Sequence, residues 1–228
     1  MITSESYPGS KAGAGVWQRI ISLMPAHENY FEPFLGHGIV LRSKRRAPGL
    51  NVGCDVDAGV VDWWRQRPQS PWMTILQEDA LRIPSLFPEM MVPPTLVYLD
   101  PPYLLSTRTR LVYRSEFCTV EEHLALLQMI KSLKCLVMIS VYTSRLYDRE
   151  LDGWHSVSYR TMTRGGHRRE CLWMNFPAGL PLHDVRFVGE GFRERERIKR
   201  KRDRWTSRLL AMPVAERQVI REALAAVD

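Results

Sequence analysis

The sequence predicts an α/β protein built on a mostly parallel sheet. Continuous apolar runs such as Leu96–Leu99 and Cys135–Ser140 are typical of strands that are buried on both faces. Segments with helical spacing of apolar residues lie between these runs. One run ends at Asp100, directly before two prolines, which cannot continue a central ladder. Because ligands bind at the carboxyl ends of parallel strands, we expect the functional site beside Asp100.

The totals favour a basic intracellular protein. Its 228 residues are enough for one domain with a core and an appendage, and the net charge of +7 favours a polyanionic partner. The polar first residues do not resemble a signal peptide, and no apolar run approaches the roughly 20 residues of a membrane span. We therefore expect a cytoplasmic location, no membrane and reduced thiols. The cysteines form no paired motif and predict no metal site: Cys54, Cys118, Cys135 and Cys171.

The first ordered segment is Tyr7–Lys11, followed by a helix that carries Val16, Ile20 and Ile21. Ser10 is a candidate cap for that helix. A lysine near a helix start opposes the helix dipole, so Lys11 is either solvated or directed at an anion such as a carboxylate.

A short strand through Tyr30–Phe31 leads into a glycine-bearing turn, and a helix is expected from about Ile39. Gly36 and Gly38 allow the backbone to approach a ligand closely and to aim helix N–H groups at it. Glu32 is suited to accept a hydrogen bond from a ligand's ammonium group. The alternative is a plain connection between a strand and a helix.

Two more strands should end in acids. The segment Leu50–Asp57 ends in acids, and its Asp55 lies about 20 residues past the glycines, where an acid holds ribose hydroxyls in nucleotide-binding units. Asp57 is better explained as the cap of the helix that follows, Ala58–Arg67. The strand Trp72–Leu76 leads to Asp79, which either accepts an adenine amine or lies in a surface turn.

The second half of the sheet follows the Asp100 region. Residues 104–117 are polar and basic and predict a hairpin or flap beside the site. Thr119 and Glu122 form a capping-box pattern for a helix to about Lys134. Two strands, His155–Thr161 and Cys171–Phe176, flank the basic turn Arg164–Arg169, so a hairpin should complete the sheet with an antiparallel strand.

From about Gly191 the chain becomes strongly basic, with two helices interrupted at Pro213. Nine bases against three acids give +6, nearly all of the net charge. Nucleic-acid contact, a solvated face and an oligomer-forming tail remain alternatives for this segment. The bases are Arg193, Arg195, Arg197, Lys199, Arg200, Lys201, Arg202, Arg204 and Arg208.

The ordered motifs resemble the Dam-type (D12 class) DNA adenine-N6 methyltransferases. The resemblance rests on Tyr7–Lys11, Tyr30–Gly38 and Asp100–Tyr103, with Asp55 and Asp79 at the next two motif positions. It covers about residues 7 to 176. It implies a Rossmann-like, seven-stranded, mostly parallel sheet with one antiparallel strand, here as a catalytic domain over 1–184 with a basic helical extension over 185–228. It also implies S-adenosylmethionine (SAM) as methyl donor.

Carried over residue by residue, the resemblance assigns three groups of site residues and no metal. The target base would meet Asp100, Pro101, Pro102 and Tyr103. SAM would be bound by Tyr7, Lys11, Glu32, Pro33, Phe34, Gly36, His37, Gly38, Asp55, Val56, Asp79 and Ala80. Nucleic acid would be bound by Arg108, Arg110, Arg114, Arg164, Arg168, Arg197, Lys199, Arg200, Lys201 and Arg202.

The chain departs from the family pattern in two places. His37 stands where a glycine is common, so its backbone angles must be ones that a non-glycine residue tolerates. No separate recognition insert is present, so target recognition would fall to residues 104–117 and the basic C-terminal segment. The expected partner is DNA, duplex or single-stranded, for a monomer or homodimer in the cytoplasm of a bacterium or a phage-infected host.

Asp100 carries the predicted chemistry. Hydrogen bonds from an adenine N6 amine to the Asp100 carboxylate and the Pro101 carbonyl would stabilise the charge that develops on nitrogen, while Tyr103 stacks on the flipped base. RNA is the nearest alternative acceptor, and a non-catalytic nucleic-acid binder is the alternative from another class. Small-molecule and protein amide methyltransferases usually have asparagine at the position of Asp100.

Overall fold

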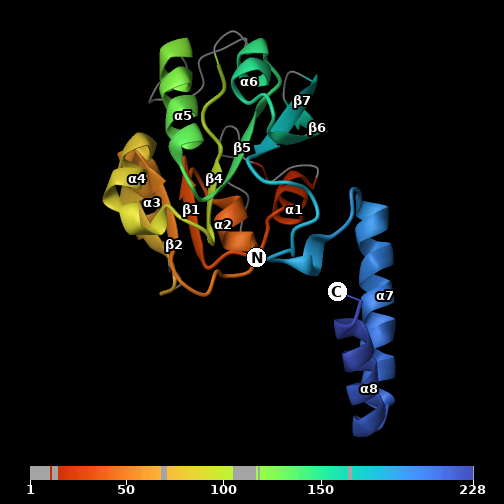
Figure 1. Cartoon of the computed structure of the whole chain (residues 1–228). Coiled ribbons are helices and arrows are strands. Elements are labelled where there is room, and N and C mark those ends of the chain that lie inside the picture. The colour runs from red at the N-terminus through yellow and green to blue at the C-terminus, as the bar shows by residue number, and fades with distance from the viewer. Residues whose placement is uncertain are drawn as a thin grey trace. The chain divides into compact units, whose positions relative to one another are not determined.

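The structure is a computed structural model that describes residues 11, 15–67, 71–104, 117, 119–163 and 166–227, without the side chains of 160–168. The chain divides into two compact units, residues 1–184 and residues 185–228. Figure 1 shows the chain coloured from its N-terminus to its C-terminus.

The first unit is built on a seven-stranded sheet with the order β3-β2-β1-β4-β5-β7-β6. Strands β1 to β5 pair in parallel, and β7 runs antiparallel to both of its neighbours. The predicted fold class, a mostly parallel sheet with one antiparallel strand, is therefore confirmed. The strands are β1 (Asn29–Pro33), β2 (Asn51–Asp55), β3 (Thr74–Gln77), β4 (Thr95–Leu99), β5 (Leu136–Tyr142), β6 (His155–Thr163) and β7 (Gly166–Met174).

The direction of winding reverses between β1 and β4. From β1 the chain builds outward through β2 to β3, then returns to place β4 on the other side of β1. Such a switch leaves a crevice at the carboxyl ends of the two strands, because the connections leave in opposite directions. Glu32 lies near the end of β1 and Asp100 directly follows β4, so both residues lie at the carboxyl ends of these two strands.

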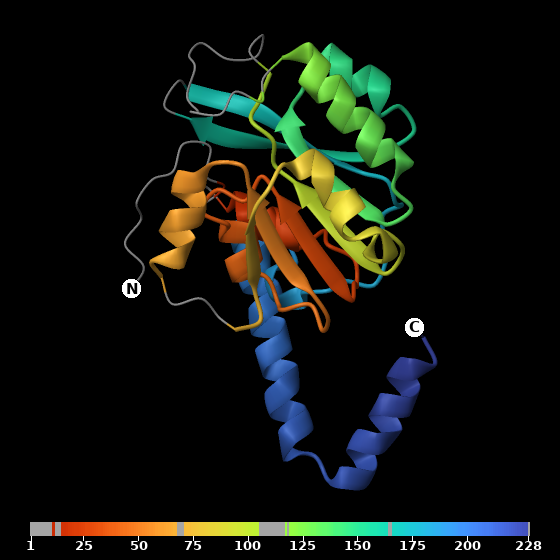
Figure 2. The ribbon, with the colours of Figure 1, turned by 90° about the vertical axis from the view of Figure 1, so that its left-hand side faces the viewer.

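Helices cover both faces of the sheet. α1 and α2 lie on one face, and α4 and α5 lie on the other (Figures 1 and 2). The helices of the first unit are α1 (Val16–Ile21), α2 (Ile39–Ser43), α3 (Ala58–Arg65), α4 (Ile83–Leu86), α5 (Val120–Ser132) and α6 (Arg145–Glu150), with short 3₁₀ turns at Ala80–Arg82 and Pro88–Met90.

Side-chain parity separates the two faces of the sheet. In β1, β4, β5 and β7, odd-numbered residues such as Phe31, Val97 and Ile139 belong to one buried cluster, together with Leu126 and Ile130 of α5. Because successive strand side chains point to opposite faces, the even-numbered residues of these four strands share the other face. These include Glu32, Tyr98, Ser140, Tyr142 and, through its pairing opposite Tyr142, Glu170.

Several local predictions are confirmed. Asp57 caps α3 by accepting a hydrogen bond from the Gly59 amide. Thr119 and Glu122 form the expected capping box of α5. The three cysteines within the described residues, Cys54, Cys135 and Cys171, are buried free thiols.

Two local predictions were wrong, and one helix was missed. Gly15, not Ser10, is the N-cap of α1, and its backbone is left-handed (φ 77°). β7 begins at Gly166 instead of Cys171, so Arg168 lies in the strand and not in a turn. Pairing of Thr163 with Gly166 leaves room for only a two-residue connection, which extends the ladder into the basic segment. The helix α6, capped by Ser144, was not predicted.

The second unit contains a 3₁₀ turn (Val185–Phe187) and two exposed helices, α7 (Phe192–Ala211) and α8 (Val214–Ala225). The two helices form a V that bends at Pro213, as the sequence predicted (Figure 2). Neither has a buried residue. Among the described residues, no helix combines the length and the apolar character that crossing a bilayer requires.

Candidate active site at the carboxyl ends of β1 and β4

Lys11 lies at the centre of a buried charge cluster. Its Nζ atom is 2.7 Å from Asp100 Oδ1 and 2.6 Å from Glu170 Oε1, and its side chain is only 5% exposed. Lys11 also donates to the hydroxyl of Tyr103. A solvated Lys11 was one of the two alternatives left open by the sequence, and it is excluded. The lysine is directed at carboxylates.

Glu170 is the member of this cluster that sequence reasoning missed. Its side chain is 1% exposed, and Oε1 accepts hydrogen bonds from Tyr103 and from the Ser140 hydroxyl at 3.2 Å and forms an ion pair with Lys11. A signal was present in the sequence, since an acid directly precedes the apolar run Cys171–Met174. The residue was missed because the predicted strand began at Cys171, whereas β7 begins at Gly166 and includes Glu170.

Tyr103 is held from two sides. Its hydroxyl donates to Glu170, and its ring stacks on Tyr142, with centroids 3.9 Å apart and planes at 26°. Tyr142 is the last residue of β5, two positions after Ser140 on the same face of the sheet. The orientation of Tyr103 is thus fixed by groups from β5 and β7, far from it in sequence.

Asp100 is one-fifth exposed, whereas Lys11 and Glu170 are almost completely buried. Burial, opposed by Lys11 and assisted by Glu170, raises the pKa of Asp100 to about 6. Burial alone would lower the pKa of Lys11, but Asp100 and Glu170 outweigh it and raise that pKa well above its ordinary value. Lys11 is therefore a cation, and Asp100 is ionised at neutral pH.

Glu32 is a second buried acid at the same edge. Its Oε2 accepts a hydrogen bond from Tyr30 at 2.7 Å. Burial, with a smaller contribution from Asp100, raises the pKa of Glu32 to about 8, although Tyr30 and Lys44 act in the opposite direction. A cation that enters the crevice would favour the ionised form of Glu32 and would be bound by it.

The glycine turn after β1 has the backbone that its sequence requires. Gly36 and Gly38 have positive φ (48° and 56°). His37 is not among the non-glycine residues with positive φ, so the prediction for its backbone is confirmed; instead Phe34 has a φ of 67°. The His37 ring stacks on Trp63, with centroids 4.0 Å apart.

Asp55 joins this turn to the end of β2. Its Oδ2 accepts from the Gly36 amide at 2.9 Å, and its Oδ1 accepts from the Asp57 amide at 3.0 Å. A carboxylate oxygen has two lone pairs, so each oxygen retains capacity for a ligand hydroxyl. Val56, the next residue, is 54% exposed and offers an apolar surface at the same strand end.

Asp79 caps the 3₁₀ turn after β3 by accepting from the Leu81 amide at 2.9 Å. It thus lies in a turn at the strand end, and both of its predicted alternatives remain compatible with this position. Ala80 is buried behind it, and Pro33 is buried at the end of β1. The acids Glu32, Asp55 and Asp79 therefore mark the carboxyl ends of three adjacent strands.

The predicted nucleic-acid residues fall into two groups. Arg197, Lys199, Arg200, Lys201 and Arg202 are exposed on α7. Four others lie outside the described residues: Arg108, Arg110, Arg114 and Arg164. For Arg168 only the backbone is described. Tyr7 of the predicted SAM group also lies outside the described residues.

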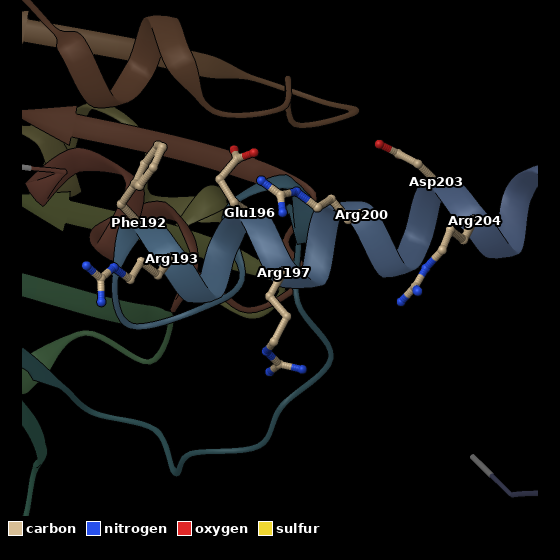
Figure 3. A pocket seen from close by; sticks show the side chains of 7 residues that line it. All are labelled: Phe192, Arg193, Glu196, Arg197, Arg200, Asp203 and Arg204. Carbon is tan, nitrogen blue, oxygen red and sulfur yellow. The ribbon is translucent and has the colours of Figure 1, made fainter.

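α7 carries an arginine stripe, which we define as Arg193, Arg197, Arg204 and Arg208. At 3.6 residues per turn these four side chains fall within a narrow arc, and the stripe is about 22 Å long at 1.5 Å per residue. In Figure 3, Arg193, Arg197 and Arg204 point to one side of the helix, away from Glu196 and Asp203. The side chains in Figure 3 border a hollow of about 810 Å³, which includes none of the Asp100 cluster.

Comparisons with known proteins give similarity of fold only. No protein-family model and no curated protein matches the sequence. Similar solved structures include a SAM-dependent methyltransferase from Agrobacterium tumefaciens, with a TM-score of 0.47 and 13% identity over 75% of this chain. The match covers 63% of the Agrobacterium protein, less than two thirds of its length.

Two further structures have similar scores. Magnesium protoporphyrin IX methyltransferase from Synechocystis PCC 6803 has a TM-score of 0.47 and 14% identity, over 70% of this chain and 75% of its own. An rRNA methylase from Streptococcus thermophilus has a TM-score of 0.46 and 9% identity, over 69% of this chain and 93% of its own.

Proposed function

We propose that this protein transfers a methyl group from SAM to the exocyclic N6 amine of adenine in DNA. The observation that carries the proposal is the position of Asp100. It follows β4 at the topological switch point, Lys11 binds one of its oxygens, and the described residues provide no hydrogen-bond partner for the other. A one-fifth exposed acceptor held in this way suits a substrate amine.

The residues along the strand ends fit SAM. A buried acid at β1 suits an ammonium group, an acid at β2 suits ribose hydroxyls, and an acid at β3 suits an adenine amine. The exposed side chain of Val56 suits the face of an adenine ring. When bound, SAM supplies an activated methyl group on a sulfonium centre. In this reading residues 1–184 are the catalytic domain and residues 185–228 are its extension.

The chain's own residues would orient and polarise the target amine. The free oxygen of Asp100 and the Pro101 carbonyl accept its two N–H groups, which draws the nitrogen lone pair out of the ring. Asp100 also stabilises the positive charge that the nitrogen gains, and it is placed to take the proton that the nitrogen then releases. Tyr103, held by Glu170 and Tyr142, offers an aromatic surface to the base.

A nucleic-acid acceptor is supported by charge. An adenine inside a duplex is out of reach and must be flipped out at a cost of a few kcal/mol. Phosphate contacts by basic side chains offset that cost. The arginine stripe on α7 supplies such side chains, and its neighbouring arginines are about one or two helical turns apart.

The Asp100→Ala variant tests the proposal. Transfer of labelled methyl groups from SAM to adenine-containing DNA should fall at least 100-fold, while SAM binding measured by calorimetry survives. Asp152→Ala, which removes an exposed acid after α6, is the matched control and should keep full activity.

Running duplex DNA, single-stranded DNA and structured RNA side by side identifies the acceptor. Methylation of RNA alone would reassign the substrate to RNA. Wild-type protein that binds nucleic acid but not SAM would instead make it a binding protein without this activity.

A further inference from the structure

The buried Glu170 side chain is not explained by packing alone. An acid that is 1% exposed in a central strand is expensive unless its charge is compensated. Here one oxygen collects three donors, from the segment before α1, from the residues after β4 and from β5. Glu170 therefore connects parts of the chain that meet only at the site.

The charge balance of the cluster depends on Glu170. Lys11 contributes +1, and Asp100 and Glu170 each contribute −1, so the ionised cluster carries −1. Without Glu170, Lys11 and Asp100 would form a neutral pair. A neutral pair would give little stabilisation to a substrate nitrogen that becomes positive during methyl transfer.

We propose that Glu170 is a positioning residue of the methyl-transfer site. It holds Lys11 and Tyr103 in place and supplies the second negative charge, so that Asp100 presents net negative charge to the substrate amine even though an ammonium group is bound to it. This inference rests on the proposed function. Glu170 does not touch the substrate and acts through Lys11, Tyr103 and Asp100.

Other groups around Asp100 do not replace Glu170. Asp100 interacts electrostatically with the carboxyl of Glu32 in β1. It interacts in the same way with four phenols: Tyr30 in β1, Tyr98 in β4, Tyr103 after β4 and Tyr159 in β6. Burial raises the pKa of each of these phenols well above its ordinary value, so they stay neutral. Glu32 bonds to Tyr30, and no contact between Glu32 and Lys11 occurs among the described residues.

Glu170→Gln is the test, because the amide keeps an acceptor oxygen and removes the charge. We expect kcat for methyl transfer to fall at least tenfold with the KM for SAM unchanged. The acidic limb of the pH–rate profile should also move to lower pH, since Glu170 raises the pKa of Asp100 and its loss leaves Lys11 acting on Asp100 alone. A structural role alone would lower stability without moving that limb.

Glu121→Gln on α5 removes an exposed acid and should change neither kcat nor the limb. Unchanged kcat and an unmoved limb in Glu170→Gln would overturn the proposal. Wild-type protein without transfer to any acceptor would instead refute the proposed function, and the decision on Glu170 would pass to a stability measurement.

The same stability measurement tests the proposal if Glu170→Gln does not fold. Lys11→Met leaves two carboxylates facing each other, whereas Lys11→Met combined with Glu170→Met removes the ion pair as a unit. We expect the double variant to unfold at a higher temperature than Lys11→Met alone. An equal or lower unfolding temperature would show that the two charges are not coupled and would overturn the proposal.

Discussion

At the scale of single residues, the site is defined by acids that are less acidic than usual. Burial raises the pKa of Asp100 to about 6 and that of Glu32 to about 8. Such groups are costly to the folded state, because folding must remove them from water. Acids of this kind cluster where a protein binds or reacts with a ligand, since a cation or an amine compensates them only when it is present.

The cost of Glu32 gives a prediction about stability and pH. Its pKa rises from 4.5 to about 8 on folding, so the folded state binds more protons across that window and loses stability as pH increases. Glu32→Gln keeps an acceptor for Tyr30 and removes the titration. We expect the variant to gain stability over the wild type as pH rises from 5 to 8, while its affinity for SAM falls.

Urea unfolding at several pH values, with calorimetry of SAM binding, measures both effects. Glu28→Gln, an exposed acid just before β1, serves as control and should show no pH-dependent gain. A difference in unfolding free energy between Glu32→Gln and the wild type that is the same at all pH values would show that the pKa of Glu32 does not change on folding.

At the scale of elements, the turn between β1 and α2 is tightly constrained. Gly38 combines a φ of 56° with close packing, because a Cβ atom there would lie 2.6 Å from Trp64 and 2.8 Å from Leu35. The Gly36 carbonyl accepts from Trp64 Nε1 at 2.9 Å, so α3 also holds the turn. The turn is therefore fixed by packing from α3 and by the carboxylate of Asp55.

Gly38→Ala should be considerably more destabilising than Gly153→Ala. Both glycines have positive φ, but a Cβ at Gly153 meets nothing within 4 Å. Gly153→Ala therefore carries only the backbone cost of about 1–2 kcal/mol, while Gly38→Ala adds an overpacking cost of about 1–3 kcal/mol. The difference in unfolding free energy isolates the contact with Trp64. Equal losses of unfolding free energy in the two variants would mean that the turn moves to accommodate the new Cβ atom at no cost.

At the scale of the whole molecule, the charge is concentrated in the second unit. Residues 193–208 hold a net +6 of the +7. The first unit ends in an anchored segment: His183 stacks on His27 at 3.8 Å, and Asp184 accepts from the Arg45 amide at 2.8 Å. The boundary after Asp184 is thus fixed by contacts within the first unit.

The arginine stripe gives a prediction about nucleic-acid binding. Replacing Arg193, Arg197 and Arg204 by alanine removes three charges from one side of α7. If each contacts a phosphate, the slope of log K against log salt should become less steep by about 0.9 per contact. The matched control replaces three bases that lie outside the stripe on the same helix: Arg195, Lys199 and Arg202.

Fluorescence titrations of both triple variants with duplex DNA at several salt concentrations decide the matter. The two variants have the same net charge, so a general charge effect would weaken binding equally in both. A larger loss in the stripe variant supports a defined DNA-binding face. Identical salt slopes in the stripe variant and the wild type would exclude a DNA-binding face at the arginine stripe.

The sequence by itself determined the fold class and half of the site. The signals that predicted them are local: buried apolar runs, the prolines after Asp100, the glycines after β1 and the caps at Asp57 and Thr119. Each depends only on residues that are near in the sequence. Only the tertiary structure decided the rest. Lys11 and Glu170 are 159 residues apart, and nothing local to either predicts a contact. Sheet order and side-chain parity place both beside Asp100, because pairing of β5 with β7 brings a distant acid onto the face where β4 ends.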